Sequence, residues 1–531
     1  LPAAENRGGV LRDEDREALE RQQIFLAPHG MEQFHLEIQN LYAALAQPTE
    51  KLTVSYPVSD GKGAEKRPSF VIGRIARLLP SISVETESAD KEYRLSAKST
   101  ALEYAGEHIG GALWQYFEGQ GDAERALAAM KDASRYTRGH LSRDAVRALY
   151  GGAVTLSASR MDMARSCHFA YFMRYGLKAR ERTGAGFDAP QIGTFVHDVM
   201  EHTLRQAKEC GGLHTLSKDK LHALVRASIE EYIDRVLPDL CEKSARFRYL
   251  FNRLCATVER IMDEVSEELQ SSDFEPLAFE LEFGADGQLP AITIREENGT
   301  ARVVGKVDRV DGWLHDGKLY LRVVDYKTGK KSFDLAELRY GLGLQMLLYL
   351  FTLKEEGQML FGGHEIVPAG VLYTPAREPM LRCARDTEPE KIEKALKKEL
   401  RRSGMVLEDP AVLQAMEHSA LESPCYLPIA VKRDGAVTGS LASAEQLGKL
   451  SKYVDHILHE ITQEVFAGNI DADPYARTPQ QSACTYCEFA SACHFENGCG
   501  SDRMEYIKAT KNDEFWQYID EVNGEGAHEN G

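Results

Sequence analysis

The spacing of apolar and polar residues divides the chain into segments of different structure. In "ALEYAGEHIGGALWQYF", apolar side chains recur three and four positions apart, which predicts amphipathic connecting helices within residues 95–152. The segment 1–94 combines a helical pattern with the strand-like run "KLTVSY". Helical and strand patterns mix in the segment 153–500, and the polar tail 501–531 is expected to fray. The pattern therefore predicts a large domain of helices and strands that follows a separate amino-terminal part and a helical connector.

Two strand patterns in the large domain carry charged side chains where they end. Period two in "LYLRVVDYK" places Asp325 and Lys327 on the same face. The upstream run "RVVGKVDRVDGW" is joined to it by the turn-like "LHDGK", so the two runs are predicted to be antiparallel neighbours. Asp308 is then expected to lie beside Asp325, at a strand end that faces solvent.

Two neighbouring carboxylates indicate a cation site. They repel each other unless a positive charge lies between them, and a hard divalent cation prefers oxygen ligands of this kind. Lys327 adds a positive charge where a phosphate can dock, so the set suits metal-dependent phosphodiester hydrolysis. The alternative is that both aspartates end their strands in solvent and Lys327 only pairs with one of them.

Two helical patterns add polar side chains to this set. In "QIGTFVHDVMEHTLRQA", His197 lies at the border of an apolar stripe, and Gly193 precedes it by one turn. A histidine in this position is usually a packed boundary residue. In "YGLGLQMLLYLFTL", Gln345 and Tyr349 are four residues apart on an otherwise apolar helix, where two polar groups need a reason.

The order of these motifs resembles the RecB family of PD-(D/E)XK nucleases. The series runs from the G-x-x-x-H motif through "AFELEF", "GKVDRVD" and "VVDYKTG" to "LQMLLYL". The resemblance implies an α/β fold with a mixed central sheet flanked by helices, and a deoxyribonuclease that uses Mg²⁺ or Mn²⁺. The residues that take family roles are His197, Glu280, Asp308, Asp325, Lys327, Gln345 and Tyr349.

In that family the histidine and the acidic residues hold the catalytic metals. The lysine assists the chemistry, and the glutamine and tyrosine line the site. Glu282 lies on the same strand face as Glu280, so the resemblance assigns the additional carboxylate to Glu280 less securely than the other residues.

Three cysteines near the end of the domain indicate a metal or iron-sulfur centre. Cys484, Cys487 and Cys493 have the spacing C-x2-C-x5-C, which leaves a four-thiolate site one ligand short. The segment "SRMDMARSCHF" places Cys167 just before the nuclease core, and it resembles the segment that supplies the first cysteine in AddB-type and Cas4-type nucleases. The resemblance implies a 4Fe-4S cluster held by these four cysteines. A zinc site with Cys499 as the fourth ligand is the alternative.

The amino-terminal part resembles the last motor segment of superfamily 1 helicases. The match lies in "LYAALAQPTEKLTVSYPVSDGKGAEKRPS", where the threonine-arginine-alanine of that family falls on Ala46, Gln47 and Pro48. The arginine is absent, and the sequence contains no G-x-x-x-x-G-K-[ST] phosphate loop. The chain as given is therefore expected not to hydrolyse ATP. Because it begins at Leu1 rather than Met, we expect it to be the rear part of a longer polypeptide, whose upstream part binds ATP.

Helicase remnant, connector, cysteine and nuclease follow in the order of the B-subunit family of AddAB-type helicase-nucleases. This resemblance implies an exonuclease that resects double-strand breaks for recombinational repair. It implies double-stranded DNA ends and single strands as ligands, and a heterodimer with an A subunit. Two alternatives stay open: a DNA-binding scaffold that does not cut, and a Cas4-like nuclease that acts without a helicase partner.

The overall charge limits where DNA can bind. The chain has 64 basic and 82 acidic residues, a net charge of −18, so a polyanion must use a local basic patch. One candidate is "KIEKALKKELRR", which brings Lys391, Lys394, Lys398 and Arg401 near one helical face; a solvated helix surface is the other interpretation. No apolar run is long enough to cross a membrane, and the amino end is too polar for a signal peptide, so a cytoplasmic location is expected.

Overall fold

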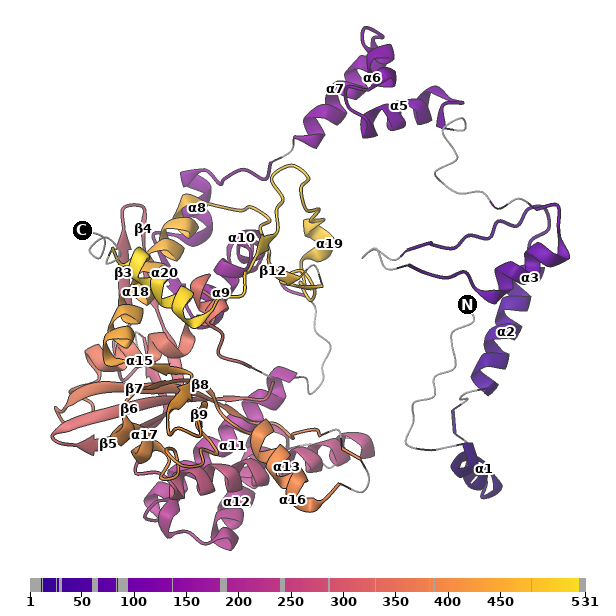
Figure 1. Cartoon of the computed structure of the whole chain (residues 1–531). Helices are drawn as coiled ribbons and strands as arrows, with labels where there is room; N and C mark the ends of the chain where they lie inside the picture. Colours follow the sequence, from indigo (N-terminus) through magenta and orange to yellow (C-terminus); the bar gives the residue numbers. More distant parts are fainter. Residues whose placement is uncertain are drawn as a thin grey trace. The chain divides into compact units, whose positions relative to one another are not determined.

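The structure of the chain is a computed structural model that describes most residues between 11 and 524. The residues outside the description are 1–10, 12, 25, 28–30, 60–64, 83, 85–93, 136, 182–188, 239–243, 285–286, 330, 382, 385–386, 479 and 525–531. The chain divides into two compact units, Leu1–Lys131 and Asp132–Gly531 (Figure 1). None of the described helices is long and apolar enough to cross a membrane.

Helices make up most of the regular structure described in the first unit. They are α1 (Asp13–Arg21), α2 (Met31–Ala46), α3 (Phe70–Leu78), α5 (Lys98–Glu107), α6 (Ala112–Phe117) and α7 (Asp122–Ser134), which runs past the end of the unit. Trp114 and Phe117 are buried in a small core formed by α5, α6 and α7. The strand predicted at 51–56 was wrong, because no described segment forms a ladder with these residues.

A mixed six-stranded sheet forms the centre of the second unit. Its strands, in spatial order, are β11 (Leu441–Ala442), β8 (Ser403–Leu407), β7 (Glu365–Pro375), β6 (Lys318–Lys327), β5 (Gly305–His315) and β2 (Glu275–Phe283). The pairs β6/β7 and β8/β11 are parallel, and the other three are antiparallel. The predicted α/β fold with a mixed central sheet is therefore confirmed.

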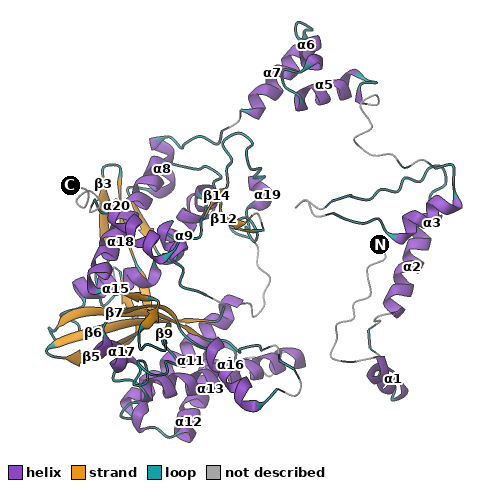
Figure 2. Cartoon of the chain, viewed as in Figure 1, coloured by secondary structure: helices purple, strands orange, loops and turns teal. Residues whose placement is uncertain are grey.

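Helices cover both faces of the central sheet. Figure 2 shows α15 and α18 on one side and α11, α12 and α13 on the other. The helices are α8 (Arg143–Tyr150), α9 (Ala158–Ser166), α10 (His168–Tyr171), the π-helix η2 (Phe172–Gly176), α11 (Ala189–Glu209), the 3₁₀-helix η3 (Leu213–Thr215), α12 (Lys218–Val236), α13 (Ala245–Gln270), α14 (Leu335–Arg339), α15 (Gln345–Glu356), α16 (Pro389–Glu399), α17 (Pro410–Met416), α18 (Ala444–Ala467), α19 (Ala490–Cys493) and α20 (Asn512–Val522). Because both faces are covered, Leu321, Val323 and Val324 of β6 are all fully buried.

Smaller sheets complete the second unit. They pair β1 (Ala153–Leu156), β4 (Gly299–Val303) and β3 (Ile292–Glu296); β9 (Ile429–Val431) and β10 (Val437–Gly439); and β13 (Gln481–Ser482), β12 (Tyr475–Thr478) and β14 (Glu505–Tyr506). The β12 sheet lies beside the segment that carries three of the clustered cysteines (Figure 1).

The carboxyl-terminal segment is partly folded, which corrects the expectation that all of 501–531 frays. Residues 512–522 form α20, and Phe515, Trp516 and Ile519 are buried in the main core. α20 packs on α18, so its apolar stripe leaves water. The part of the tail from 525 onward lies outside the described residues.

The predicted hairpin of β5 and β6 is confirmed. His315 pairs with Lys318 across a two-residue turn in which Asp316 and Gly317 have φ angles of 48° and 77°. An Asp-Gly pair suits this turn because both central residues need positive φ, and a two-residue turn sets the register of the strands. With Arg309 opposite Val324, the next positions along are Asp308 and Asp325.

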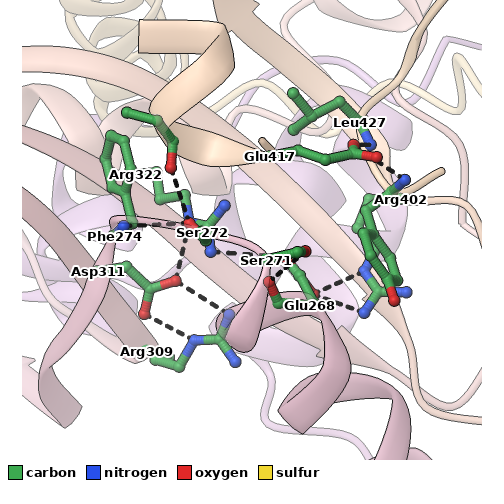
Figure 3. A network of polar contacts seen from close by, with 12 residues as sticks. Glu268, Ser271, Ser272, Phe274, Arg309, Asp311, Arg322, Arg402, Glu417 and Leu427 are labelled. Carbon is green, nitrogen blue, oxygen red and sulfur yellow. Dashed lines mark hydrogen bonds and ion pairs between the residues drawn. The ribbon is translucent and has the colours of Figure 1, made fainter. Parts of the chain in front are cut away.

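A network of buried charges lies among α13, β5, β6 and the chain after α16 (Figure 3). Asp311 Oδ2 accepts from Arg309 Nη2 at 3.0 Å and from Arg322 Nε at 2.9 Å, and Arg309 Nε lies 2.8 Å from Asp311 Oδ1. Glu268 pairs with Arg402 at 2.5 Å and with Arg322 at 3.5 Å. All five side chains are nearly or fully buried, so each charge depends on its partners instead of on water.

Asp311→Ala is expected to lower the free energy of unfolding by about 3–5 kcal/mol, because it leaves two buried guanidinium groups without their carboxylate. Chemical denaturation monitored by circular dichroism measures the change. The matched control is Glu365→Ala, which removes a carboxylate paired with Lys318 on the surface, with the Glu365 side chain 64% exposed, and should cost at most about 1 kcal/mol. Equal losses in the two variants would refute a special role for the buried network.

Candidate active site

Asp308, Asp325 and Lys327 meet at the end of the β5–β6 hairpin. Lys327 Nζ lies 2.6 Å from Asp325 Oδ2, as expected for two side chains on one strand face. The backbone N–H of Tyr326 donates to Asp308 Oδ2 at 2.9 Å, which brings Asp308 against the same strand. The expected neighbourhood of the two aspartates is therefore confirmed.

The expectation that Asp325 faces solvent was wrong. Its side chain is only 5% exposed. Gln345, the first residue of α15, lies over it, with Nε2 3.5 Å from Asp325 Oδ1. Burial and the nearby charge of Asp308 raise the pKa of Asp325, although Lys327 opposes the shift. A buried carboxylate beside a second carboxylate is in an arrangement that a bound cation would stabilise.

His197 approaches the aspartates from α11. Its Nε2 lies 2.9 Å from the Tyr326 carbonyl oxygen, and its Nδ1 lies 3.3 Å from Asp308 Oδ2. A carbonyl can only accept, so Nε2 carries the proton, and in the neutral ring the Nδ1 lone pair is directed toward Asp308. Burial lowers the pKa of His197, but the hydrogen bond with Asp308 and the negative charges of Asp308 and Asp325 together outweigh burial, so the pKa is raised. Such a ring is oriented for metal ligation through Nδ1.

Glu280 on β2 completes a group of possible metal ligands. Ligand atoms of His197, Glu280 and Asp308 all lie within 4.8 Å of one another. Glu280 has a φ of 49°, a left-handed conformation that is rare for non-glycine residues and that often occurs at functional sites. The side chain of Glu282 is 55% exposed against 13% for Glu280. The geometry thus favours Glu280 as the additional carboxylate.

Lys306 is a charged neighbour of this group that the sequence interpretation missed. Its Nζ lies 2.5 Å from Glu280 Oε2 and 3.6 Å from Glu282 Oε1. Burial raises the pKa of Glu280, and the hydrogen bond from Lys306 opposes that shift. Because Lys306 is two positions before Asp308 on β5, period two placed it on the same face and offered a signal for it.

The two polar residues of α15 lie together as predicted. Gln345 Nε2 donates to the Tyr349 hydroxyl at 3.2 Å, one helical turn away. Both line a cavity of about 600 Å³ that Lys306 also lines. Gly305 borders the same cavity, where a Cβ atom would come within 2.5 Å of the Tyr349 ring. The site therefore opens to a cavity beside β5. Position 305 must be glycine, because a Cβ atom there would clash with the Tyr349 ring.

The four predicted cluster cysteines line one cavity of about 750 Å³. They are Cys167, Cys484, Cys487 and Cys493. Cys499, the alternative ligand, is exposed and does not line the cavity. Burial raises the pKa of Cys167 to about 12, and burial together with the neighbouring thiols raises the pKa of Cys484 to about 11. Thiols gathered in this way become ligands only if a metal stabilises the thiolates.

The spacing of the sulfur atoms bears on which centre they fit. Among the residues that the structure describes, no three cysteine sulfurs lie within 4.8 Å of one another. Four thiolates around one zinc, at a Zn–S distance of about 2.3 Å, lie about 3.8 Å apart. The cysteine-lined cavity is thus more open than a closed zinc site.

Arg138 supports the cysteine-lined cavity and was not found from the sequence. Its Nη2 donates to the Cys493 carbonyl at 2.8 Å, and its Nε lies 2.9 Å from Asp502 Oδ1. The guanidinium also lies 4.5 Å from the centre of the Phe169 ring. No sequence signal pointed to this residue, because its hydrogen-bond partners Cys493 and Asp502 are more than three hundred positions away.

The comparisons with known proteins agree with this architecture. Residues 155–494 match the PD-(D/E)XK nuclease superfamily. The chain is 30% identical over 546 residues to the B subunit of the ATP-dependent helicase/deoxyribonuclease of Ruminiclostridium cellulolyticum, a match that covers 98% of this chain and 47% of the relative. It is 31% identical over 543 residues to the protein of the same name from Acetivibrio thermocellus, with the same coverage.

The corresponding protein of Clostridium perfringens is 30% identical over 555 residues, covering 99% of this chain and 48% of the relative. The chain therefore spans about half the length of the curated relatives that it matches. The family match covers well over half of the chain. It includes β5 and β6, which carry Asp308 and Asp325, and all four clustered cysteines. The chain belongs to the PD-(D/E)XK nuclease superfamily.

Proposed function

We propose that the second unit is a metal-dependent DNA exonuclease domain. The observation that carries the proposal is the meeting of His197, Glu280 and Asp308 beside the Asp325–Lys327 pair. Nitrogen and carboxylate ligands in this arrangement suit a divalent cation such as Mg²⁺ or Mn²⁺. A bound cation would supply a Lewis acid and an activated water for phosphodiester hydrolysis.

Each neighbouring residue has a role in this proposal. His197, Glu280, Asp308 and Asp325 hold the cation. Lys327 stabilises the negative charge that develops on the phosphate, because its ammonium lies at the edge of the site and is 31% exposed. Gln345 and Tyr349 line the substrate side, where their mutual hydrogen bond restricts both side chains.

The wider function follows from the relatives' names. Relatives named as B subunits of an ATP-dependent helicase/deoxyribonuclease support a role for this chain within a helicase-nuclease. We propose that it acts on double-stranded DNA ends and single strands in the cytoplasm, during end resection for recombinational repair. The same names support a heterodimer with an A subunit. Residues 1–94, within the first unit, then correspond to the degenerate helicase part.

We also propose that the cysteine-lined cavity holds a 4Fe-4S cluster. Support comes from the convergence of Cys167 with Cys484, Cys487 and Cys493 on one cavity and from the position of Cys499 outside it. The cluster would join the beginning and the end of the nuclease domain.

Cleavage of labelled linear DNA tests the nuclease proposal. The 531-residue chain is expected to release nucleotides in Mg²⁺ or Mn²⁺ and to stop when EDTA is added. Asp308→Asn is the comparison, since it keeps the side-chain volume but removes one ligand charge. Cleavage that persists in EDTA or in Asp308→Asn would refute the proposal.

Glu280→Gln is expected to weaken divalent-metal binding by about 10–100-fold, because one of the converging ligands loses its charge. Isothermal titration of the protein with Mn²⁺ measures the affinity directly. The matched control is Glu282→Gln, two positions along the same strand, with a side chain that is 55% exposed. Glu282→Gln should bind Mn²⁺ like the wild type. If Glu282→Gln weakened Mn²⁺ binding and Glu280→Gln did not, the metal ligand would be Glu282.

A further inference from the structure

We propose that a basic cavity beside the active site binds the phosphates of a single DNA strand next to the bond that is cut. This inference rests on the proposed nuclease function and extends it to a strand-binding site. The cavity measures about 390 Å³. Its charged lining residues are Lys327, Lys331, Arg377, Lys398, Glu399 and Arg401.

The charge of this cavity is opposite to that of the chain. Five cations and one carboxylate line it, in a protein with a net charge of −18. Arg377 pairs with Glu399 at 3.1 Å, and Lys331 lies 3.6 Å from Glu337. Within the described part of the chain, no carboxylate pairs with Lys398 or Arg401. Lys398 and Arg401 therefore leave two positive charges at the cavity that no described carboxylate neutralises, and such charges favour a polyanion.

The rim of the cavity is held by the buried charge network. Arg402 is 3% exposed, and its guanidinium pairs with Glu268 at 2.5 Å (Figure 3). Its backbone N–H donates to the Tyr426 carbonyl at 3.0 Å. Because Arg402 points into the core, its neighbour Arg401 lies on the cavity side, where it also donates to the Pro424 carbonyl. Arg401 is thus held in place at the rim before a ligand arrives.

The cavity continues from the catalytic residues. Lys327 lines it and also contacts Asp325. On the other side, Gln345 contacts Asp325 and lines the cavity of about 600 Å³ beside β5. Asp325 therefore lies between these two cavities. A DNA strand that passes over Asp325 can enter both of them. At about 390 Å³ the basic cavity is near the lower end of the ~300–1,000 Å³ of small-ligand sites, which suits part of one strand and is too small for a duplex.

This placement also decides between the two interpretations of "KIEKALKKELRR". Lys398 and Arg401 line the cavity, whereas Lys391 pairs with Glu388 and Lys397 pairs with Glu393 on exposed parts of α16. In this proposal Lys391 and Lys397 belong to a solvated helix surface, and Lys398 and Arg401 belong to the strand-binding rim.

Binding of a fluorescent single-stranded oligonucleotide, measured by anisotropy in EDTA, tests the inference without requiring cleavage. The variant Lys398→Ala/Arg401→Ala is expected to bind at least about tenfold more weakly than the wild type in 50 mM salt. Two lost phosphate contacts reduce the salt slope by about 1.4, so the deficit should shrink about sevenfold between 50 and 200 mM salt. The control Lys391→Ala/Lys397→Ala also removes two positive charges, from exposed positions of α16, and should bind like the wild type.

Lys398→Glu tests whether weaker binding comes from a folding defect. Because Lys398 is exposed, the thermal unfolding temperature should be unchanged while DNA binding weakens. Equal binding by the rim and control variants, or no binding by the wild type, would overturn the inference. Cleavage assays in Mg²⁺ separate the two hypotheses. A wild type that binds through the rim but does not cut refutes only the nuclease function, and one that cuts while the rim variants bind normally refutes only the strand site.

Discussion

Asp325→Asn is expected to reduce DNA cleavage by at least about 10³-fold while single-strand binding in EDTA stays close to that of the wild type. The carboxylate lies 2.6 Å from Lys327 and is covered by Gln345, so its loss removes a ligand charge and the partner of the lysine at once. Asparagine keeps the shape of the buried side chain. Rates of nucleotide release from labelled linear DNA in Mg²⁺ give the size of the effect.

The stability of the same variant separates function from folding. Burying Asp325 near Asp308 without a cation costs free energy, so in metal-free buffer Asp325→Asn should unfold at the same temperature as the wild type or at a higher one. The control Asp316→Asn changes an aspartate in the turn of the same hairpin, with a side chain that is 89% exposed, and should keep full cleavage. Wild-type cleavage by Asp325→Asn would show that the catalytic assignment is wrong.

Cys167→Ala is expected to lose bound iron and to destabilise the nuclease domain by about 6 kcal/mol. The magnitude is the chain-entropy estimate for releasing a loop of this length, since Cys167 lies 317 positions before Cys484. Iron and sulfide analysis of anaerobically purified protein, with the visible absorption of the cluster, measures the loss. Thermal unfolding should begin at a lower temperature, and proteolysis should release the carboxyl-terminal segment first.

Cys499→Ala is the matched control for the cluster. This cysteine lies in the same terminal segment but is exposed and outside the cavity that Cys167 lines. It should keep full iron content and stability. If Cys499→Ala lost the metal and Cys167→Ala kept it, the fourth ligand would be Cys499. Zinc in place of iron in the wild type would contradict the cluster itself.

Local patterns predicted the geometry that depends on neighbours in sequence. The Asp-Gly turn and period two predicted the register that brings Asp308 beside Asp325, because a two-residue hairpin allows few alternatives. Helical spacing predicted the contact of Gln345 with Tyr349 for the same reason. The tail was misjudged because its composition is polar, although the apolar stripe of 512–522 finds a partner in α18.

The tertiary structure was needed to choose between residues that the sequence pattern treats alike. Alternation placed Glu280 and Glu282 on one face, and only the left-handed backbone at Glu280 and its approach to His197 and Asp308 separated them. Burial of Asp325 depends on α15, which packs over the strand end. A one-dimensional pattern contains neither the bend of a strand nor the helix that covers it.

The sequence by itself determined the β5–β6 hairpin, the contact of Gln345 with Tyr349 and the types of ligand that the site offers, because these follow from side-chain chemistry and from contacts within a few residues. Only the tertiary structure decided which distant groups meet. The pairing of Arg402 with Glu268 joins segments more than one hundred positions apart, and the cavity brings Arg401 together with Lys327 of β6. Such contacts form when apolar faces pack around the central sheet. The spacing of residues within one segment does not predict them.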